Sequence, residues 1–146
     1  MAKIELKLKE MGYELVVPGP SRHPILRCKQ VGNLVFVSGH ISDTKGKLGD
    51  SLTVEQGYQA AKEAAVHCLE ALLGYLGDLD RIRNIVKVFG MINSAPDFTQ
   101  QAAVMNGASE LLIETFGETG QHTRSAVGMC SLPAGIAVEI EMIVEI

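Results

Sequence analysis

Side chains alternate in character along the last extended segment of the chain, residues 137–144, whose sequence is AVEIEMIV. Successive side chains of a β-strand point to opposite faces, so one face of this segment is wholly apolar and the other carries Glu139 and Glu141. Such alternation is typical of an antiparallel sheet that packs one face on helices. The acid-bearing face then meets water, a ligand or a partner subunit.

Residues 121–146 together predict a hairpin of two strands. Valine and isoleucine are frequent in both arms, and the sequence PAG at 133–135 supplies a fixed φ and then a glycine that tolerates positive φ. Arg124 lies in the first arm, and a tight register would bring it opposite Glu139 or Glu141. This charge group has two interpretations: an ion pair on a solvated sheet, worth up to ~1 kcal/mol, or a site for an anionic ligand.

Composition argues against several classes of protein. The chain has 146 residues and a net charge of −4, without the dense basic stretch that a nucleic-acid surface shows. It lacks a signal-peptide core and the ~18 apolar residues of a membrane span, so we expect a cytoplasmic protein with no membrane partner. The histidines are scattered and no CxxC or HxxxH spacing occurs, so we expect no metal and no cofactor. The three cysteines, Cys28, Cys68 and Cys130, predict reduced, buried thiols.

Periodicity and turn residues predict a single domain over residues 1–146. Residues 1–23 comprise a short amphipathic helix and then a proline-rich extended arm. A capping-box pattern, Thr53 with Gln56, marks the start of the longest helix. This helix is predicted to end at Gly77, and a second helix is capped by Asp97 and ends at Gly117. The remaining predicted elements are strands at 25–30, 34–38 and 82–92.

The order of these elements favours an α+β two-layer sandwich, with a mixed sheet and two helices on one face, after a short N-terminal helix. This arrangement leaves the second sheet face uncovered by the chain itself. Association into a closed cyclic oligomer would cover that face and create clefts between subunits. The sequence therefore predicts a homo-oligomer.

From residue 24 onward the sequence resembles the reactive-intermediate deaminase family, RidA/YjgF, whose members are also described as L-PSP endoribonuclease-like. The resemblance rests on five short motifs: GN at 32–33, VSG at 37–39, NSAPDF at 93–98, RS at 124–125, and LP at 132–133 followed by VEIE at 138–141. It implies a chorismate-mutase-like fold and a homotrimer with three intersubunit clefts. It also implies an imine deaminase, a hydrolase that converts 2-imino or 2-enamino acids into 2-keto acids and ammonia.

The resemblance assigns roles to particular residues. The family's cleft arginine falls on Arg124, its carboxylate on Glu139, and its Ser-Gly backbone contact on Ser38 and Gly39. A guanidinium holds a substrate carboxylate by two parallel charge-assisted hydrogen bonds, and Glu139 would hold the attacking water or exchange its proton. The implied partner is a small carboxylate-bearing metabolite.

Several positions depart from the usual deaminase pattern and indicate a divergent branch with an N-terminal extension. Ile25 stands where many members have a cleft tyrosine, and His122-Thr123 precedes the arginine where Pro-Ala is common. Asn106 and His122 are therefore additional polar candidates for substrate binding. The pattern leaves open whether Glu139 or Glu141 faces the ligand, because a one-residue slip in register exchanges the two faces.

Three functions remain open at this point. The first is the deaminase. The second is a non-catalytic binder of small carboxylate-bearing metabolites, which would use the same arginine but hold no water in position to attack the ligand. The third, an endoribonuclease, requires a groove of positive charge, which the acidic composition of this chain disfavours.

Overall fold

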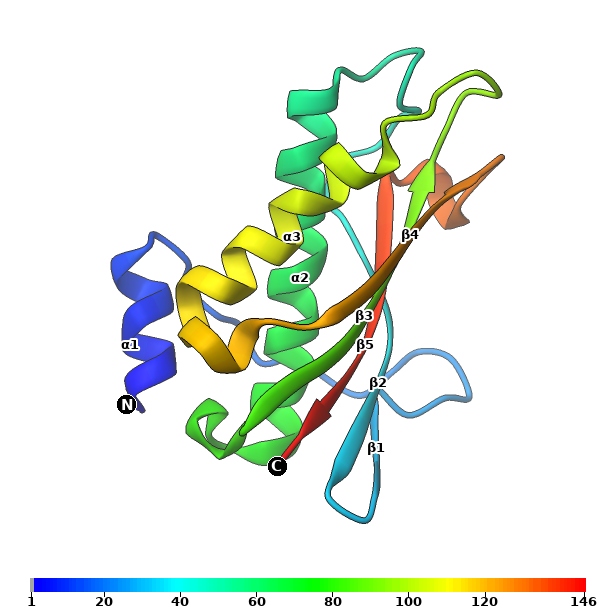
Figure 1. Cartoon of the computed structure of the whole chain (residues 1–146). Coiled ribbons are helices and arrows are strands. Elements are labelled where there is room, and N and C mark those ends of the chain that lie inside the picture. Colours follow the sequence, from blue (N-terminus) through cyan, green and yellow to red (C-terminus); the bar gives the residue numbers. More distant parts are fainter. Residues whose placement is uncertain (1) are drawn as a thin grey trace.

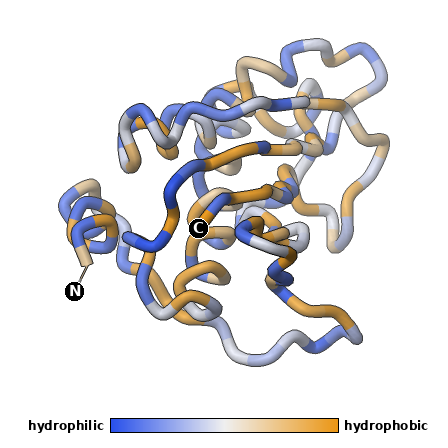
Figure 2. The backbone as a smooth tube through the Cα atoms, turned by 60° about the horizontal axis from the view of Figure 1, so that its bottom comes forward, coloured by the Kyte–Doolittle hydropathy of each residue, from blue (hydrophilic) through white to orange (hydrophobic). Residues whose placement is uncertain are grey.

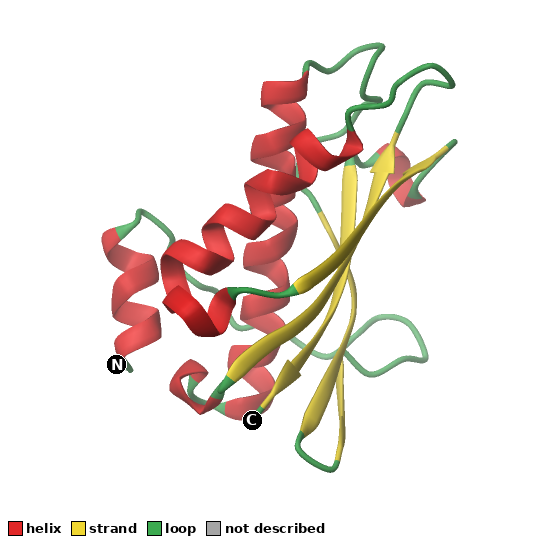
Figure 3. Ribbon diagram, viewed as in Figure 1, coloured by secondary structure: helices red, strands yellow, loops and turns green. Residues whose placement is uncertain are grey.

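A computed structural model describes residues 2–146 of the chain. A mixed five-stranded sheet in the order β1-β2-β5-β3-β4 carries helices on one face, which confirms the predicted fold class (Figure 1 and Figure 3). The strands are β1 (Cys28–Val31), β2 (Leu34–Ile41), β3 (Asn84–Asn93), β4 (Thr123–Met129) and β5 (Val138–Glu145). The helices are α1 (Lys3–Glu10), α2 (Val54–Leu76) and α3 (Gln101–Phe116), with short 3-10 turns η1 (Leu79–Arg81), η2 (Gly117–Gly120) and η3 (Pro133–Gly135).

The hairpin predicted for residues 121–146 is wrong. β4 and β5 are not neighbours, because β3 lies between them, antiparallel to β5 and parallel to β4. Helix α3 carries the chain from the end of β3 back to the start of β4, and a crossover of this kind makes two strands parallel. Alternating side chains identify a strand but do not identify its neighbour. The expected cross-strand pair of Arg124 with Glu139 or Glu141 is therefore also wrong.

The alternation predicted along β5 is confirmed. Its apolar face packs with α2 and α3 in one core, whereas Glu139 and Glu141 lie on the opposite face, which we call the open face. Hydropathy changes sign repeatedly along the helices and strands, as expected for elements with one face in a core (Figure 2). The buried residues of β5 are Val138, Ile140, Met142 and Val144.

The two long helices approach each other closely at Gly107 of α3. A Cβ atom at this position would overlap the carbonyl oxygen of Tyr58 on α2. The backbone of α2 can approach this closely only because glycine has no side chain. This close approach fixes the position of α3, the helix that supplies part of the candidate site.

The ends of α2 follow the sequence prediction, whereas the start of α3 does not. The Thr53 hydroxyl oxygen accepts a hydrogen bond from the Gln56 backbone N–H at 3.2 Å, and Gly77 ends α2 with a φ of 79°. Asp97 does not cap α3, whose N-cap is Gln100 without a side-chain hydrogen bond. The Phe98 N–H donates to the Ala95 carbonyl oxygen at 3.0 Å, and the helix begins only after this turn.

Helix α1 is held by a residue distant in sequence. The Asp80 carboxylate accepts hydrogen bonds from the backbone N–H groups of Lys3 and Ile4, at 3.0 and 2.9 Å. These bonds lower the pKa of Asp80, because only the ionised form accepts both fully. Leu8 on the inner face of α1 is fully buried, so the predicted N-terminal helix forms and packs on the domain.

Two further expectations have a definite outcome. Cys28 and Cys68 are buried as predicted, but Cys130 is exposed because it follows the last residue of β4, where the chain leaves the sheet. None of the helices within residues 2–146 has both the length and the apolar character needed to cross a membrane.

Candidate functional site

Arg124 lies on the edge strand β4 and points to the helix side of the sheet. Its Nη1 donates to Asn106 Oδ1 at 2.9 Å and to Ser109 Oγ at 3.1 Å, both on α3. Asn106 and Ser109 are three residues apart, so they share one face of the helix. Two neutral oxygens therefore orient the half-buried guanidinium from one side.

His122 extends this group and fixes its hydrogen-bond polarity. Its Nε2 lies 2.8 Å from Ser109 Oγ, and its Nδ1 lies 2.6 Å from the Gly120 carbonyl oxygen. A carbonyl only accepts, so Nδ1 carries the proton, and Nε2 of the neutral ring accepts from the Ser109 hydroxyl. The chain of donors then runs from Arg124 through Ser109 to His122. We call Arg124, Ser109 and His122, together with Asn106, the arginine cluster.

Part of the guanidinium stays available to a ligand. Both hydrogens of Nη1 are used by α3, whereas the N–H groups on Nε and Nη2 have no hydrogen-bond partner within residues 2–146. No carboxylate in this part of the chain forms a salt bridge with Arg124. The Nε–Nη2 edge matches the two oxygens of a carboxylate.

Glu139 belongs to a second group on the open face. β2 pairs with β5 through an irregularity between Val37 and His40, which places Ser38 and Gly39 in a bulge. A Cβ atom on Gly39 would overlap the carboxylate of Glu139, so the acid lies directly over the glycine backbone. Burial and, secondarily, the negative charge of Glu141 raise the pKa of Glu139.

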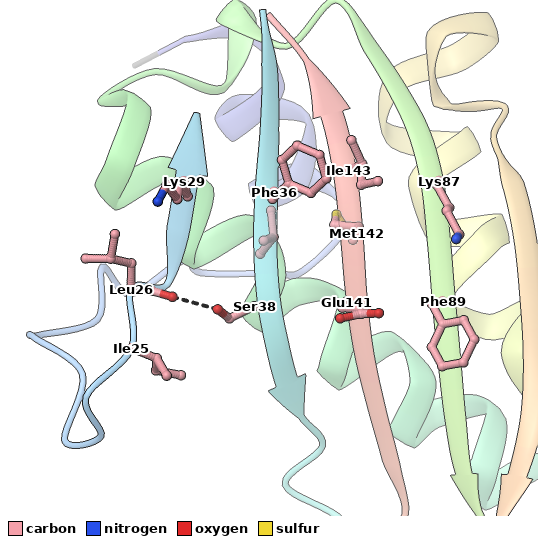
Figure 4. A pocket seen from close by; sticks show the side chains of 11 residues that line it. Ile25, Leu26, Lys29, Phe36, Ser38, Lys87, Phe89, Glu141, Met142 and Ile143 are labelled. Atoms are coloured by element: carbon pink, nitrogen blue, oxygen red, sulfur yellow. Dashed lines mark hydrogen bonds between the residues drawn. The ribbon is translucent and has the colours of Figure 1, made fainter. Parts of the chain in front are cut away.

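Ser38 fixes the extended arm to the sheet. Its hydroxyl donates to the Leu26 carbonyl oxygen at 2.6 Å, and its backbone N–H donates to the Arg27 carbonyl oxygen at 2.9 Å. The segment that carries Ile25 is thereby held beside the open face (Figure 4). The side chain of Ser38 is used structurally, which leaves the backbone around Gly39 for contact with a ligand.

A cavity of about 520 Å³ opens on the same face, between the arm and the sheet (Figure 4). Most of its lining is apolar, and Glu141 is its only acidic residue. Arg124 is not part of its wall. The lining residues are Ile25, Leu26, Lys29, Phe36, Val37, Ser38, Lys87, Phe89, Glu141, Met142 and Ile143.

The two groups are well separated within one chain. Glu139 lies opposite Met91 of β3, and Met91 in turn lies opposite Val127 of β4, three residues beyond Arg124. Two strand spacings of ~4.8 Å and three residues of ~3.3 Å place the Cα atoms of Arg124 and Glu139 ~14 Å apart. Their side chains also point to opposite faces. The structure thus unites Arg124 with Asn106 and His122, and Glu139 with Ser38 and Gly39, but does not unite the two sets in one protomer.

Sequence reasoning missed Ser109, the residue that contacts both Arg124 and His122. Its spacing of three from Asn106 on a predicted helix was the available signal, since residues at that spacing are neighbours on the helix surface. Ser109 is buried, with 9% of its surface exposed, which is uncommon for a serine without a structural or functional partner.

One cluster of carboxylates has metal-ligand spacing: Glu5, Asp78 and Asp80. Backbone N–H groups account for these acids. Asp80 caps α1, Asp78 caps η1 by accepting from the Asp80 N–H at 2.7 Å, and Glu5 accepts from the Leu79 N–H at 3.4 Å. We therefore assign the cluster to the attachment of α1.

Comparison with known proteins agrees with this architecture. Residues 25–145 match a family described as YjgF/chorismate mutase-like, candidate endoribonuclease. Protein TCP17 of Trypanosoma cruzi is 47% identical over 102 residues, which are 69% of this chain but only 64% of that protein.

Solved structures extend the similarity over nearly the whole chain. The protein Atu1372 from Agrobacterium tumefaciens has 39% identity and a TM-score of 0.92, covering 99% of this chain and 92% of that chain. A candidate endoribonuclease from Shewanella oneidensis has 27% identity and a TM-score of 0.93, covering 98% and 99%. The YjgF gene product of E. coli shares the fold at 21% identity and a TM-score of 0.60, covering 86% and 90%. Because the family match covers most of the sequence and the resemblance to RidA/YjgF proteins is confirmed, the chain belongs to the YjgF/chorismate mutase-like family.

Proposed function

We propose that this protein hydrolyses 2-imino or 2-enamino acids to 2-keto acids and ammonia, in clefts between subunits of a cyclic homotrimer. The observation that carries the proposal is the state of Arg124. Its guanidinium is half-buried and oriented by two neutral oxygens, and its Nε–Nη2 edge has no partner within residues 2–146. A positioned, unneutralised guanidinium suits the carboxylate that 2-imino and 2-keto acids share.

The separation of the two groups supports the proposed assembly. Arg124 and Glu139 face opposite sides of the sheet, ~14 Å apart by strand geometry, so one small substrate cannot reach both within a protomer. We call Ser38, Gly39 and Glu139 the Ser38–Glu139 group. A cyclic arrangement can place the arginine cluster of one chain against the Ser38–Glu139 group of the next. Such packing would also cover part of the open face, whose exposed apolar residues include Phe36 and Val127.

The reaction needs positioning and proton transfer. Water adds to the carbon of the C=N bond as the nitrogen takes up a proton, and collapse of the carbinolamine breaks the C–N bond and releases ammonia. Glu139 accepts the proton of the water and returns one to the leaving nitrogen. Its raised pKa, caused by burial and then by Glu141, brings it closer to neutral pH, which favours exchange in both directions. The backbone at Gly39 lets the substrate approach without a Cβ atom in the way.

Mixed assemblies test this proposal. Arg124→Ala and Glu139→Gln chains should each be inactive when alone. In trimers formed from equal amounts of the two chains, about one quarter of the clefts should combine an intact arginine with an intact glutamate, restoring about that share of the wild-type activity. The assay follows ammonia release from imino acids generated in situ by an amino-acid oxidase.

The matched control mixes Arg124→Ala chains with the double variant Arg124→Ala/Glu139→Gln, a mixture that contains no intact arginine. Activity in this control, or none in the first mixture despite exchange of subunits, would contradict a site shared between chains. Absence of ammonia release from the wild-type protein would contradict the enzyme itself. Binding of 2-keto acids without turnover would then indicate a metabolite-binding protein.

Ribonuclease activity has less support, although the family description mentions it. Binding of RNA draws its affinity from cationic side chains that replace counterions. This chain has a net charge of −4, and the 520 Å³ cavity is mainly apolar.

A further inference from the structure

The 520 Å³ cavity on the open face has no role in the chemistry proposed above. Its volume falls within the range that small-molecule sites occupy, and its lining is mainly apolar. Five large apolar residues line it, from the arm and from strands β2, β3 and β5 (Figure 4). They are Ile25, Leu26, Phe36, Phe89 and Ile143.

The cavity is continuous with the Ser38–Glu139 group. Ser38 forms part of its wall, and Glu141 lies on its floor, two residues from Glu139 on the same face of β5. Phe89 lies opposite Glu141 in the sheet, just as Met91 lies opposite Glu139. A substrate held over Gly39 and Glu139 would therefore extend any long side chain into this cavity.

The charged residues in the lining limit what that side chain can be. Lys29 on β1 and Lys87 on β3 lie at the two ends of one row across the sheet, and Phe36 and Ile143 lie between them in that row. Glu141 lies between them on β5 and repels an acidic side chain at the centre of the cavity. The middle of the cavity is therefore suited to an uncharged, apolar group.

We propose that this cavity is the side-chain subsite of the enzyme and selects 2-imino acids with a large apolar side chain over those with a methyl or a carboxylate side chain. This inference rests on the proposed function. It makes Phe36, Phe89 and Ile143 specificity-determining residues. Ile25 adds to the apolar part of the wall.

The test compares imino acids made in situ from leucine, phenylalanine, alanine and glutamate. We expect kcat/KM for the leucine- and phenylalanine-derived substrates to exceed that for the alanine-derived one by about 10-fold or more, the discrimination that buried methylenes provide. Phe89→Ala should lower the leucine-to-alanine ratio by about 10-fold. Val127→Ala, a truncation of an exposed residue on β4 outside the cavity, should leave the ratio unchanged. Equal kcat/KM for leucine- and alanine-derived substrates in the wild-type protein would overturn the proposal.

A binding measurement separates failure of this inference from failure of the proposed function. Calorimetry with 4-methyl-2-oxopentanoate and with pyruvate probes the same cavity without turnover. Tighter binding of the larger keto acid, lost in Phe89→Ala, would support the subsite even if no imine were hydrolysed. Equal affinities, or binding of neither keto acid, would overturn it.

Discussion

Replacing Ser109 by alanine tests whether the arginine cluster works as a unit. The substitution removes one of the two acceptors that orient Arg124 and the hydroxyl that donates to His122 Nε2. Asn106 remains as the only anchor on α3. The guanidinium should therefore keep its charge and its place in the sequence but lose its fixed direction.

The magnitude follows from the contacts. A hydrogen bond to a charged group contributes ~1.5–3 kcal/mol, and we take ~1 kcal/mol here because Arg124 is partly exposed and water replaces the lost acceptor. If this loss appears in ligand binding, the dissociation constant for a 2-keto acid should rise about 5-fold, since ~1.4 kcal/mol corresponds to tenfold. The free energy of unfolding should fall by ~1 kcal/mol, because Nε2 of the half-buried His122 ring also loses a partner.

Calorimetry with 4-methyl-2-oxopentanoate measures the first effect and denaturant unfolding the second. Ser125→Ala is the matched control, since Ser125 is the next residue of β4 and is exposed on the opposite face. It should change neither quantity. An affinity for the keto acid within about twofold of the wild type in a folded Ser109→Ala protein would refute the idea that α3 positions Arg124 for a carboxylate.

Three further substitutions test the physical basis of the fold and the site. Glu139→Gln should stabilise the protein near pH 7 but not near pH 3. Burial and Glu141 raise the folded-state pKa of Glu139, so the wild type loses stability as pH rises from the unfolded pKa of 4.5 through the folded-state pKa. Denaturant unfolding at several pH values measures this difference. Asp80→Ala should lower the free energy of unfolding by ~1 kcal/mol near pH 7 through loss of the α1 cap. Because the pKa of Asp80 is lowered in the folded state, this stabilisation is present above the unfolded pKa of 3.8 and disappears as pH falls through the folded-state pKa. The same loss of unfolding free energy at pH 7 and at pH 2 would contradict the assignment. Gly107→Ala should lower the midpoint of thermal unfolding, because overlap with the Tyr58 carbonyl outweighs the ~1 kcal/mol that alanine gains in helix propensity. Its control is Gly74→Ala on α2, where the atoms near an added Cβ are Cγ1 of the exposed Val17 at 3.1 Å and Cδ of Pro18 at 3.9 Å, neither of them backbone carbonyl; this substitution should not destabilise the protein.

Periodicity predicted the elements of this fold well. The spacing of apolar residues predicted α1, α2 and α3, and the alternation along β5 correctly assigned Glu139 and Glu141 to the face away from the helices. These predictions succeed because burial of one face is a local property of the sequence, with a period of 3.6 or 2.

Pairing and site geometry were harder to predict. The strand nearest in sequence to β5 is β4, yet β3 occupies the position between them, because α3 returns the chain to the far side of β3. The bulge at Ser38 and Gly39 could not be predicted from the sequence either. It depends on the register in which β2 pairs with β5 rather than on the sequence of either strand alone. Arg124 and Glu139 were predicted to share a site, but no sequence pattern shows that they face opposite sides of one sheet.

The place of β5 in the sheet has a consequence for biosynthesis. This strand leaves the ribosome after the other four, yet it lies between β2 and β3 in the middle of the sheet. Until it arrives, two inner edges stay unpaired and open to contact with other nascent chains. A transcript cut short before the eight residues of β5 would yield polypeptides with helices α1, α2 and α3 but no closed core, which we expect to aggregate rather than accumulate as a shortened protein.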